Sequence, residues 1–361
     1  MRDSFPALLR QMNALGATDL FLTNGKTPAY RINGKITQSE GSALGPDNLE
    51  LFAIGIMSEE AYQRFLEDLE INISYKAAGI GRFRINVFCQ RQNISMVIRS
   101  IPSHIPTPTE LGIPASTEKL IMQKRGLILI VGPSGSGKST SLASLLDQRN
   151  EHDSSHIIMI EDPIEYVLEH KQSIINQREV GIDTKSYHAA LESALRQSPD
   201  VLGIGEIRSR DTMEQAIAFA DSGHLCIASL HANNAVQAID RILNLFPDSK
   251  HEQILLSLSM HIRAIMAQQL VPNIDGKLIA VFELLQNSSH ISDLIQKGNF
   301  AGMQDFMNKE GASEMATMDQ SLYDLFLQKI ITGETALEYA HAYRDMRLKM
   351  RLSSANTQLV Q

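Results

Sequence analysis

The stretch Gly132-Pro-Ser-Gly-Ser-Gly-Lys-Ser139 decides the fold of this 361-residue chain. It matches the phosphate-binding loop pattern G-x-x-x-x-G-K-[S/T] in full, between an apolar, strand-like run at residues 127–131 and a helical pattern. In such a loop the glycines let backbone N–H groups surround the β-phosphate, Lys138 bridges the β- and γ-phosphates, and Ser139 binds Mg²⁺. The motif therefore predicts a site for ATP and Mg²⁺ formed by Gly132, Ser134, Gly135, Ser136, Gly137, Lys138, Ser139 and Thr140.

Strand and helix patterns alternate after this loop. Apolar, strand-like runs lie at residues 156–160, 201–204 and 225–230, and helical patterns begin at Lys138, near residue 186 and at Asp211. This alternation predicts a mainly parallel sheet covered by helices on both faces, which is an α/β architecture of the RecA-like P-loop ATPase kind. Further helices are expected at residues 250–270, 291–297 and 318–329, and one further strand at 278–285.

The part of the chain before the loop has the pattern of a small α+β domain. Helices are expected at residues 5–15, 46–57 and 59–69, and strands at 19–23, 29–32, 35–37, 71–76, 81–90 and 95–101. Asn33-Gly34 predicts a hairpin turn, and three prolines within residues 102–108 predict an extended linker without helix. We expect an N-terminal domain at 1–104, a proline-rich linker at 105–118, an ATPase domain with a helical C-terminal part at 119–352, and a frayed polar tail at 353–361.

Acidic residues follow two of the predicted strands. Glu206 comes shortly after the apolar run 201–204, as a Walker B acid does, where a carboxylate holds Mg²⁺ through water or polarises the attacking water. Glu161, Asp162 and Glu165 follow the run 156–160, and Glu165 or Glu161 can supply the acceptor that activates water for attack on a γ-phosphate. The alternative for these three is a solvated acidic loop.

Two histidines and a group of arginines are further candidates. His224 begins and His231 ends the strand 225–230, which suggests a γ-phosphate sensor or an interface hydrogen bond, or a structural role for either. Arginines occur in the strand-like sequence 81–101, and alternation puts two of them, Arg82 and Arg84, on one face. Together with Arg91 and Arg99 they either reach the phosphates of a neighbouring subunit or form a solvated face.

The composition excludes several classes of protein. A net charge of −8 argues against a nucleic-acid-binding surface. The two cysteines, Cys89 and Cys226, are too few for a disulfide framework or a four-cysteine zinc module, and they suit a reducing cytoplasm. The longest apolar runs are strand-sized, and the N-terminal residues lack a signal-peptide core, so we expect no integral membrane segment.

An ordered set of short motifs resembles the ATPases of secretion systems and type IV pili, and within them the pilus retraction ATPases of the PilT/PilU family. The motifs lie at residues 132–140, 160–165, 176–180, 205–208, 223–225 and 230–235, and the resemblance covers about residues 4–350. It implies a PAS-like N-terminal domain, a RecA-like ATPase domain and a homo-hexamer driven by Mg·ATP. It also implies a cytoplasmic location at the inner membrane, on a PilC-like platform protein at the pilus base.

The same resemblance implies roles for individual residues. Glu206 matches the Walker B acid, Glu165 the catalytic glutamate, and His224 and His231 the histidine motif. Three N-domain arginines near the nucleotide are matched as well, namely Arg82, Arg84 and Arg99, whereas Arg91 is one position away from a further family arginine.

Two segments of the sequence indicate whether the chain resembles the PilU or the PilT members of the family. Residues 205–214 resemble PilU members more than PilT members, and residues 288–297 depart from the corresponding PilT motif. An accessory retraction motor that works with a PilT-like ATPase is therefore expected, with a principal PilT-like motor as the alternative. A RecA-like nucleic-acid motor and a nucleotide-binding scaffold without turnover are less favoured, because of the charge of −8 and because Lys138, Glu165 and Glu206 are all present.

The phosphate-loop motif generates a first prediction. Lys138→Ala should abolish ATP turnover, because the γ-phosphate loses its fixed counter-charge while the fold has no reason to change. Phosphate release by the purified variant measures this, with circular dichroism as the control for folding. ATPase activity close to that of the wild type would show that the loop is not the catalytic site.

Overall fold

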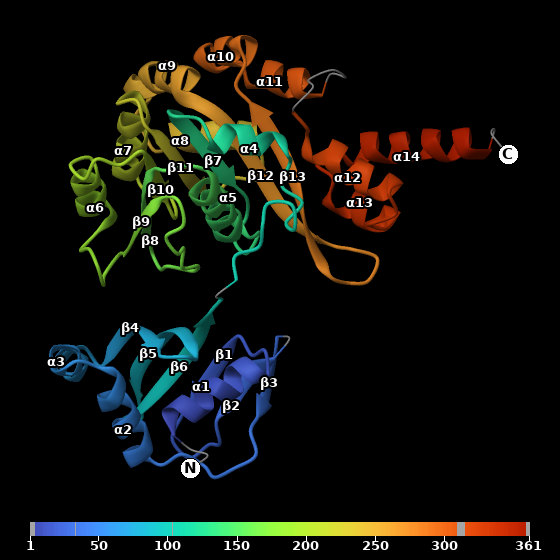
Figure 1. Cartoon of the computed structure of the whole chain (residues 1–361). Helices are drawn as coiled ribbons and strands as arrows, with labels where there is room; N and C mark the ends of the chain where they lie inside the picture. Colours follow the sequence, from blue (N-terminus) through green and yellow to red (C-terminus); the bar gives the residue numbers. More distant parts are fainter. Residues whose placement is uncertain (1–3, 33, 103, 309–314, 359–361) are drawn as a thin grey trace. The chain divides into compact units, whose positions relative to one another are not determined.

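The computed structural model describes residues 4–32, 34–102, 104–308 and 315–358 (Figure 1). The chain divides between His104 and Ile105 into two compact units, and three residues of a later loop, Glu165–Val167, are counted with the first. Within the described residues, no helix has the length and apolar character that crossing a membrane requires.

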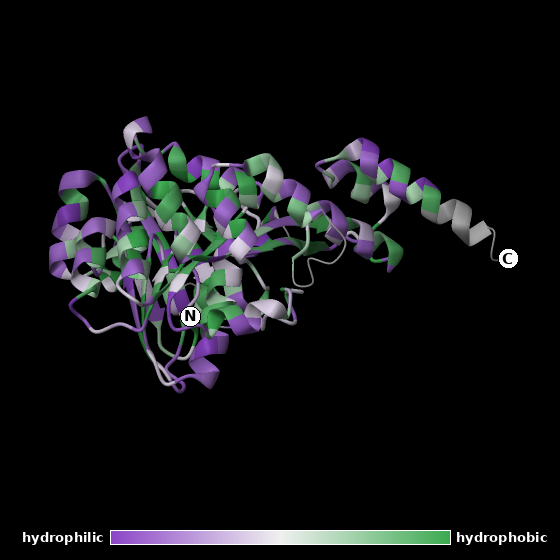
Figure 2. Cartoon of the chain, turned by 90° about the horizontal axis from the view of Figure 1, so that it is seen from above, coloured by the Kyte–Doolittle hydropathy of each residue, from purple (hydrophilic) through white to green (hydrophobic). Residues whose placement is uncertain are grey.

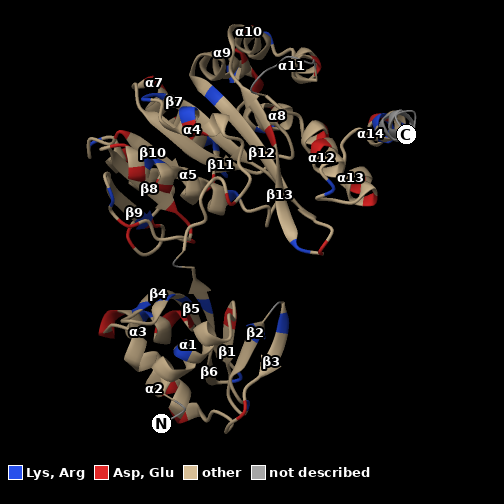
Figure 3. Ribbon diagram, turned by 45° about the vertical axis from the view of Figure 1, so that its right-hand side comes forward, with Lys and Arg blue, Asp and Glu red and all other residues tan. Residues whose placement is uncertain are grey.

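The first unit is a six-stranded antiparallel sheet with three helices, in the strand order β3-β2-β1-β6-β5-β4. Its strands are β1 (Asp19–Leu22), β2 (Ala29–Ile32), β3 (Lys35–Gln38), β4 (Glu70–Ala77), β5 (Gly81–Gln90) and β6 (Asn93–Ile101). Its helices are α1 (Phe5–Ala14), α2 (Pro46–Ile56) and α3 (Glu59–Asp68). Figure 3 shows acidic residues on α3, where Glu59 and Glu60 lie in the first turn and stabilise the positive end of the helix.

Alternating residues of β5 separate the core of this unit from its outer face. Phe83, Ile85 and Val87 are fully buried and pack with apolar residues of the three helices. Arg82 and Arg84 alternate with them and point to the other side, which confirms the prediction that these two arginines share a face. The β2–β3 pairing ends at Ile32 and Lys35, as a two-residue hairpin requires; Asn33 of the predicted turn lies outside the described residues.

The second unit contains a seven-stranded sheet in the order β13-β12-β7-β11-β10-β8-β9, in which every pair is parallel except β12 with β13. Its strands are β7 (Gly126–Val131), β8 (His156–Glu161), β9 (Ile174–Glu179), β10 (Val201–Ile204), β11 (Leu225–Leu230), β12 (Ile262–Pro272) and β13 (Leu278–Gln286). All residues of β7, β10 and β11 are buried, as expected for parallel strands with both faces covered. The α/β fold with a RecA-like second unit is confirmed.

Helices cover this sheet and extend beyond it. They are α4 (Ser116–Ile121), α5 (Lys138–His152), α6 (Tyr187–Ala194), α7 (Arg210–Asp221), α8 (Ala235–Leu243), a 3₁₀ turn η1 (Asp248–Lys250), α9 (His251–His261), α10 (Ser289–Gln296), α11 (Phe300–Met307), α12 (Met318–Leu327), α13 (Gly333–Tyr339) and α14 (Tyr343–Gln358). Figure 2 shows hydrophobic strands in the interior and hydrophilic residues on many outward helix surfaces. In Figure 1, α12, α13 and α14 form a separate group beside β13.

Three predictions of secondary structure are wrong. The helix expected at residues 250–270 ends at His261, because the apolar run that follows, β12, is paired with β7 on one side and β13 on the other. Periodicity alone does not separate such a buried strand from a helix. In addition, α4 begins at Ser116, inside the predicted linker, and α14 continues to Gln358, through most of the tail that we expected to be frayed.

Candidate active site

The phosphate loop connects β7 to α5 and is shaped by contacts with β12. Gly135 and Gly137 have φ values of 77° and 87°, a backbone conformation that glycine adopts without strain. A Cβ on Gly132 would lie 2.4 Å from the carbonyl oxygen of Gln268, so only glycine fits there. The Gln268 Nε2 group donates a hydrogen bond of 2.6 Å to the Ser136 carbonyl, which ties the loop to β12.

The side chains of the loop fit a bound polyphosphate. Lys138 is 8% exposed, and its Nζ donates to the carbonyl oxygens of Gly132 and Pro133, at 2.9 Å each. The Ser136 hydroxyl is buried and makes no hydrogen bond with any described residue. The first N–H groups of α5 form a helix N-terminus, which favours anions. Lys138 can therefore hold the phosphates, while the hydroxyl of Ser139, in the first turn of α5, can bind Mg²⁺.

Glu206 and His231 come together at the carboxyl ends of β10 and β11. The Glu206 Oε1 atom lies 2.5 Å from the His231 Nε2 atom, and Glu206 Oε2 accepts a hydrogen bond from the Arg208 Nε group. The Glu206 side chain is 14% exposed. Hydrogen bonding to Glu206 also raises the pKa of Arg208. The Glu206 carboxylate is thus mostly buried, accepts a hydrogen bond from Arg208 and lies in close contact with the His231 ring.

The parallel register brings this pair to the same sheet edge as the phosphate loop. Leu230 is paired with Val131, so His231 follows β11 at the level where the loop follows β7. Ile204 of β10 is paired with Ala228 of β11, so Glu206 follows the strand that lies on the opposite side of β11 from β7. Neighbouring strands are about 4.8 Å apart. The carboxyl ends of β7 and β10, which lie on either side of β11, are therefore roughly 10 Å from each other. This edge is where open α/β sheets bind their ligands.

The acidic residues after β8 have different surroundings. Glu161 is buried at the end of the strand and accepts a hydrogen bond of 2.9 Å from Gln177 Nε2, so its carboxylate is engaged within the fold. Glu165 lies in the loop that follows, is exposed, and makes no hydrogen bond or ion pair with any described residue. Of these two predicted candidates for activating water, Glu165 has the uncommitted carboxylate.

Three residues that the sequence analysis did not single out also shape this edge. Tyr187 and Arg208 line a pocket of about 270 Å³ together with Asp162, Glu206 and Thr212. Burial, with Asp162 and Glu161 nearby, raises the pKa of Tyr187. Arg208 belongs to the quoted motif 205–208 and could have been found there. No sequence pattern indicates a role for Gln268, because it lies in β12, in the segment 250–270 that the periodicity predicts to be a helix.

His224 lies at the other end of the sheet. It precedes β11, and its carbonyl accepts a hydrogen bond of 3.0 Å from Gly126, the first residue of β7. The six residues of β7 separate it from the phosphate loop by roughly 20 Å. His224 is therefore far from the phosphate loop of its own chain, and its role in nucleotide binding or at a subunit interface stays a prediction.

The predicted arginines lie on the outer face of the first unit's sheet. Arg84 is directly opposite Arg99 on the neighbouring strand, and Arg99 Nε lies 2.9 Å from the Asp19 Oδ1 atom. Arg31 contacts the other oxygen of Asp19 at 3.3 Å. Arg99 nevertheless keeps 69% of its side chain exposed, and Arg91 lies in the turn between β5 and β6 with a φ of 48°. The fold brings Arg82, Arg84 and Arg99 together and leaves Arg91 apart.

Known proteins share this architecture over nearly the whole chain. The family model "Type II/IV secretion system protein" matches residues 58–357. The type IV pilus ATPase PilU of Pseudomonas aeruginosa is 46% identical over 97% of this chain and 92% of its own length. The retraction ATPase PilT of the same organism is 36% identical over 90% of this chain and 94% of its own. The crystal structure of the pilus retraction motor PilT with bound ADP superimposes with a TM-score of 0.89 at 41% identity, covering 95% of this chain and 98% of that one.

The two separate lines of observation agree, since the phosphate loop, Glu206 and His231 meet at one sheet edge and the relatives named as ATPases cover that edge and both units. The chain therefore belongs to the type II/IV secretion system protein family, and within it to the type IV pilus motor ATPases of the PilT/PilU kind.

Proposed function

We propose that this chain is the subunit of a homo-hexameric, Mg·ATP-hydrolysing motor that powers type IV pilus retraction, as an accessory motor of the PilU type. The observation that carries the proposal is the convergence of Lys138, Glu206 and His231 at one sheet edge, in a chain 46% identical to PilU over 97% of its length. The 36% identity to PilT and the superposition on the PilT structure support the alternative, a principal retraction motor.

The proposed reaction assigns one task to each side chain. Lys138 neutralises the β- and γ-phosphates, and Glu165 accepts a proton from the water that attacks the γ-phosphorus while the bond to the β–γ bridging oxygen breaks. Ser139 and Glu206 would hold Mg²⁺, which would supply charge stabilisation for the transferred phosphoryl group. His231 contacts Glu206 and reports on the state of the γ-phosphate. The uncommitted carboxylate of Glu165 supports its role as the base.

The proposed assembly places arginines of the first unit near the phosphates, across a subunit interface. Three features of Arg99 support this role: exposure of most of its side chain, a hydrogen bond to Asp19 that orients it, and Arg84 directly opposite. Two adjacent guanidinium groups repel each other and are stabilised by a polyanion. Arg82 extends the same face by one position along β5.

The proposed partners follow from the family and from the charge of the chain. We place the motor in the cytoplasm at the inner membrane, on a PilC-like platform protein at the pilus base and beside a PilT-like retraction ATPase. A nucleic-acid motor has little support, because a chain with a net charge of −8 does not offer the phosphate-neutralising surface that such binding depends on.

The assignment of the base predicts the behaviour of Glu165→Gln. This variant should still bind ATP and should hydrolyse it about 10²- to 10⁴-fold more slowly, because the water loses its proton acceptor. Single-turnover hydrolysis and binding of a fluorescent ATP analogue measure the two effects. Glu169→Gln, a change of another exposed carboxylate in the same loop, is the matched control and should keep normal activity. If Glu206→Gln shows this pattern and Glu165→Gln does not, the two roles are reversed.

The arginine assignment predicts complementation between inactive subunits. Arg99→Ala subunits mixed with Lys138→Ala subunits should recover part of the ATPase activity, because some interfaces then combine an intact arginine with an intact phosphate loop. Arg31→Ala is the matched control, since Arg31 shares Asp19 but is not assigned to the phosphates; this variant should be active without mixing. A monomer that hydrolyses ATP at the wild-type rate would contradict the assembly.

The accessory role predicts a genetic pattern. Deletion of the gene should weaken forceful retraction or twitching and leave pilus assembly intact. The protein should also restore retraction to a strain whose PilT-like ATPase is catalytically inactive. Counting retraction events by fluorescence microscopy measures both effects. Complete loss of retraction on deletion alone would identify a principal motor, and loss of surface pili would identify an extension motor.

A further inference from the structure

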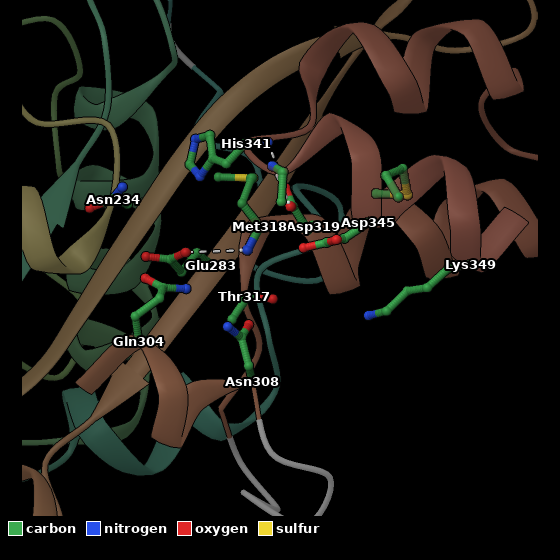
Figure 4. A pocket seen from close by; sticks show the side chains of 12 residues that line it. Asn234, Glu283, Gln304, Asn308, Thr317, Met318, Asp319, His341, Asp345 and Lys349 are labelled. Carbon is green, nitrogen blue, oxygen red and sulfur yellow. Dashed lines mark hydrogen bonds between the residues drawn. The ribbon is translucent and has the colours of Figure 1, made fainter. Parts of the chain in front are cut away.

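A buried carboxylate outside the nucleotide site joins two helices that are far apart in the sequence. Glu283 lies in the middle of β13 with 1% of its surface exposed, and it forms no ion pair with any described residue. Its Oε1 atom accepts a hydrogen bond of 2.8 Å from the Ala235 N–H, and its Oε2 atom accepts one of 3.2 Å from the Met318 N–H. Figure 4 shows the second of these bonds at the edge of a pocket of about 500 Å³.

Both donors are the first residues of helices. Ala235 begins α8 and Met318 begins α12, and each helix also has its own side-chain cap, from Asn234 and Thr317 respectively. A helix N-terminus attracts a negative charge, and Glu283 meets two of them at once. Burial raises the pKa of Glu283, whereas the two backbone N–H groups act to lower it. The two N–H groups are the hydrogen-bond donors to this carboxylate within the described residues.

One of these helices connects directly to the candidate active site. The loop between β11 and α8 consists of residues 231–234, and it starts with His231, whose Nε2 atom contacts Glu206. Since Ala235 is held by Glu283, the far end of this short loop has a fixed position. The other helix, α12, belongs to the C-terminal helical group, and the bridge between Leu284 and Ala316 holds the segment before it on β13. Glu283 therefore ties the loop of His231 to the C-terminal helices.

We propose that Glu283 is a positioning residue for ATP hydrolysis, which holds the N-termini of α8 and α12 together and thereby keeps the loop 231–234 in place with His231 on Glu206. The proposal rests on the function proposed above for Glu206 and His231. While both N–H groups share this carboxylate, the loop and α12 do not move independently. A displacement of the C-terminal helices then acts on the hydrolysis site through a single side chain.

The test is a comparison of Glu283→Gln with Asp319→Asn in the full-length assembly. Glutamine keeps the size of the side chain, but its one carbonyl oxygen serves only one of the two N–H groups and its amide faces the other. Asp319 lines the same pocket and likewise accepts from two backbone N–H groups, those of His341 and Ala342 at 2.7 and 2.8 Å. It connects only C-terminal segments and is therefore the matched control.

Glu283→Gln should lower kcat roughly 10-fold or more, because small displacements of catalytic groups have effects of that order, and should leave the KM for ATP unchanged, because the phosphate loop is not involved. Asp319→Asn should stay within about twofold of the wild-type kcat. An equal loss of kcat in both variants would show a general structural effect and overturn the proposal, as would a folded Glu283→Gln protein with normal kcat.

A second pair of variants covers the case in which Glu283→Gln does not fold. Asn234→Ala removes the side-chain cap at the same end of α8 and should also lower kcat without changing KM. Its control is Thr332→Ala, which removes the equivalent cap of α13. Normal kcat in the Asn234→Ala protein would then overturn the proposal. The two proposals fail in different ways. ATPase activity in Lys138→Ala would overturn the proposed nucleotide site, whereas normal kcat in Glu283→Gln would overturn only the positioning role of Glu283.

Discussion

The parallel pairing of β7, β11, β10 and β8 is the constraint on which the site depends. Helices cover both faces of these strands, so their residues are almost entirely apolar and buried, and polar chemistry is confined to the strand ends. Parallel strands in register place their carboxyl ends at one edge. For this reason the phosphate loop and the loop of His231 meet at this edge, although about one hundred residues separate them in the sequence.

Charge is distributed unevenly at that edge. Glu206 is held between His231 and Arg208, and Glu161 is engaged by Gln177, so both carboxylates are oriented by the fold. Glu165 has no such partner among the described residues and remains available to a substrate or a water molecule. Fixed carboxylates suit a metal ion, and an uncommitted one suits proton transfer, which is the division of labour that phosphoryl transfer needs.

Two structural links connect the edge to the rest of the second unit. Gln268 of β12 bonds the phosphate loop, and Glu283 of β13 bonds the first residues of α8 and α12. Both are buried polar side chains on neighbouring antiparallel strands, with their hydrogen bonds directed at backbone groups in loops or at helix ends. A buried polar group that loses its hydrogen bond destabilises a fold, so the bonds made by Gln268 Nε2 and by the Glu283 carboxylate favour one arrangement of the loop and the helices.

The sequence by itself determined the phosphate loop, the α/β alternation, the position of Glu206 after its strand and the outward face of Arg82 and Arg84. These features depend on local patterns, namely glycine spacing, apolar runs and the two-residue period of a strand. Only the tertiary structure decided that residues 262–272 form a strand rather than a helix, since a buried apolar run becomes a strand through the partners on either side of it. The tertiary structure alone also decided where His224, Gln268 and Glu283 lie. Their places relative to the phosphate loop depend on strand order and register, which no local pattern contains.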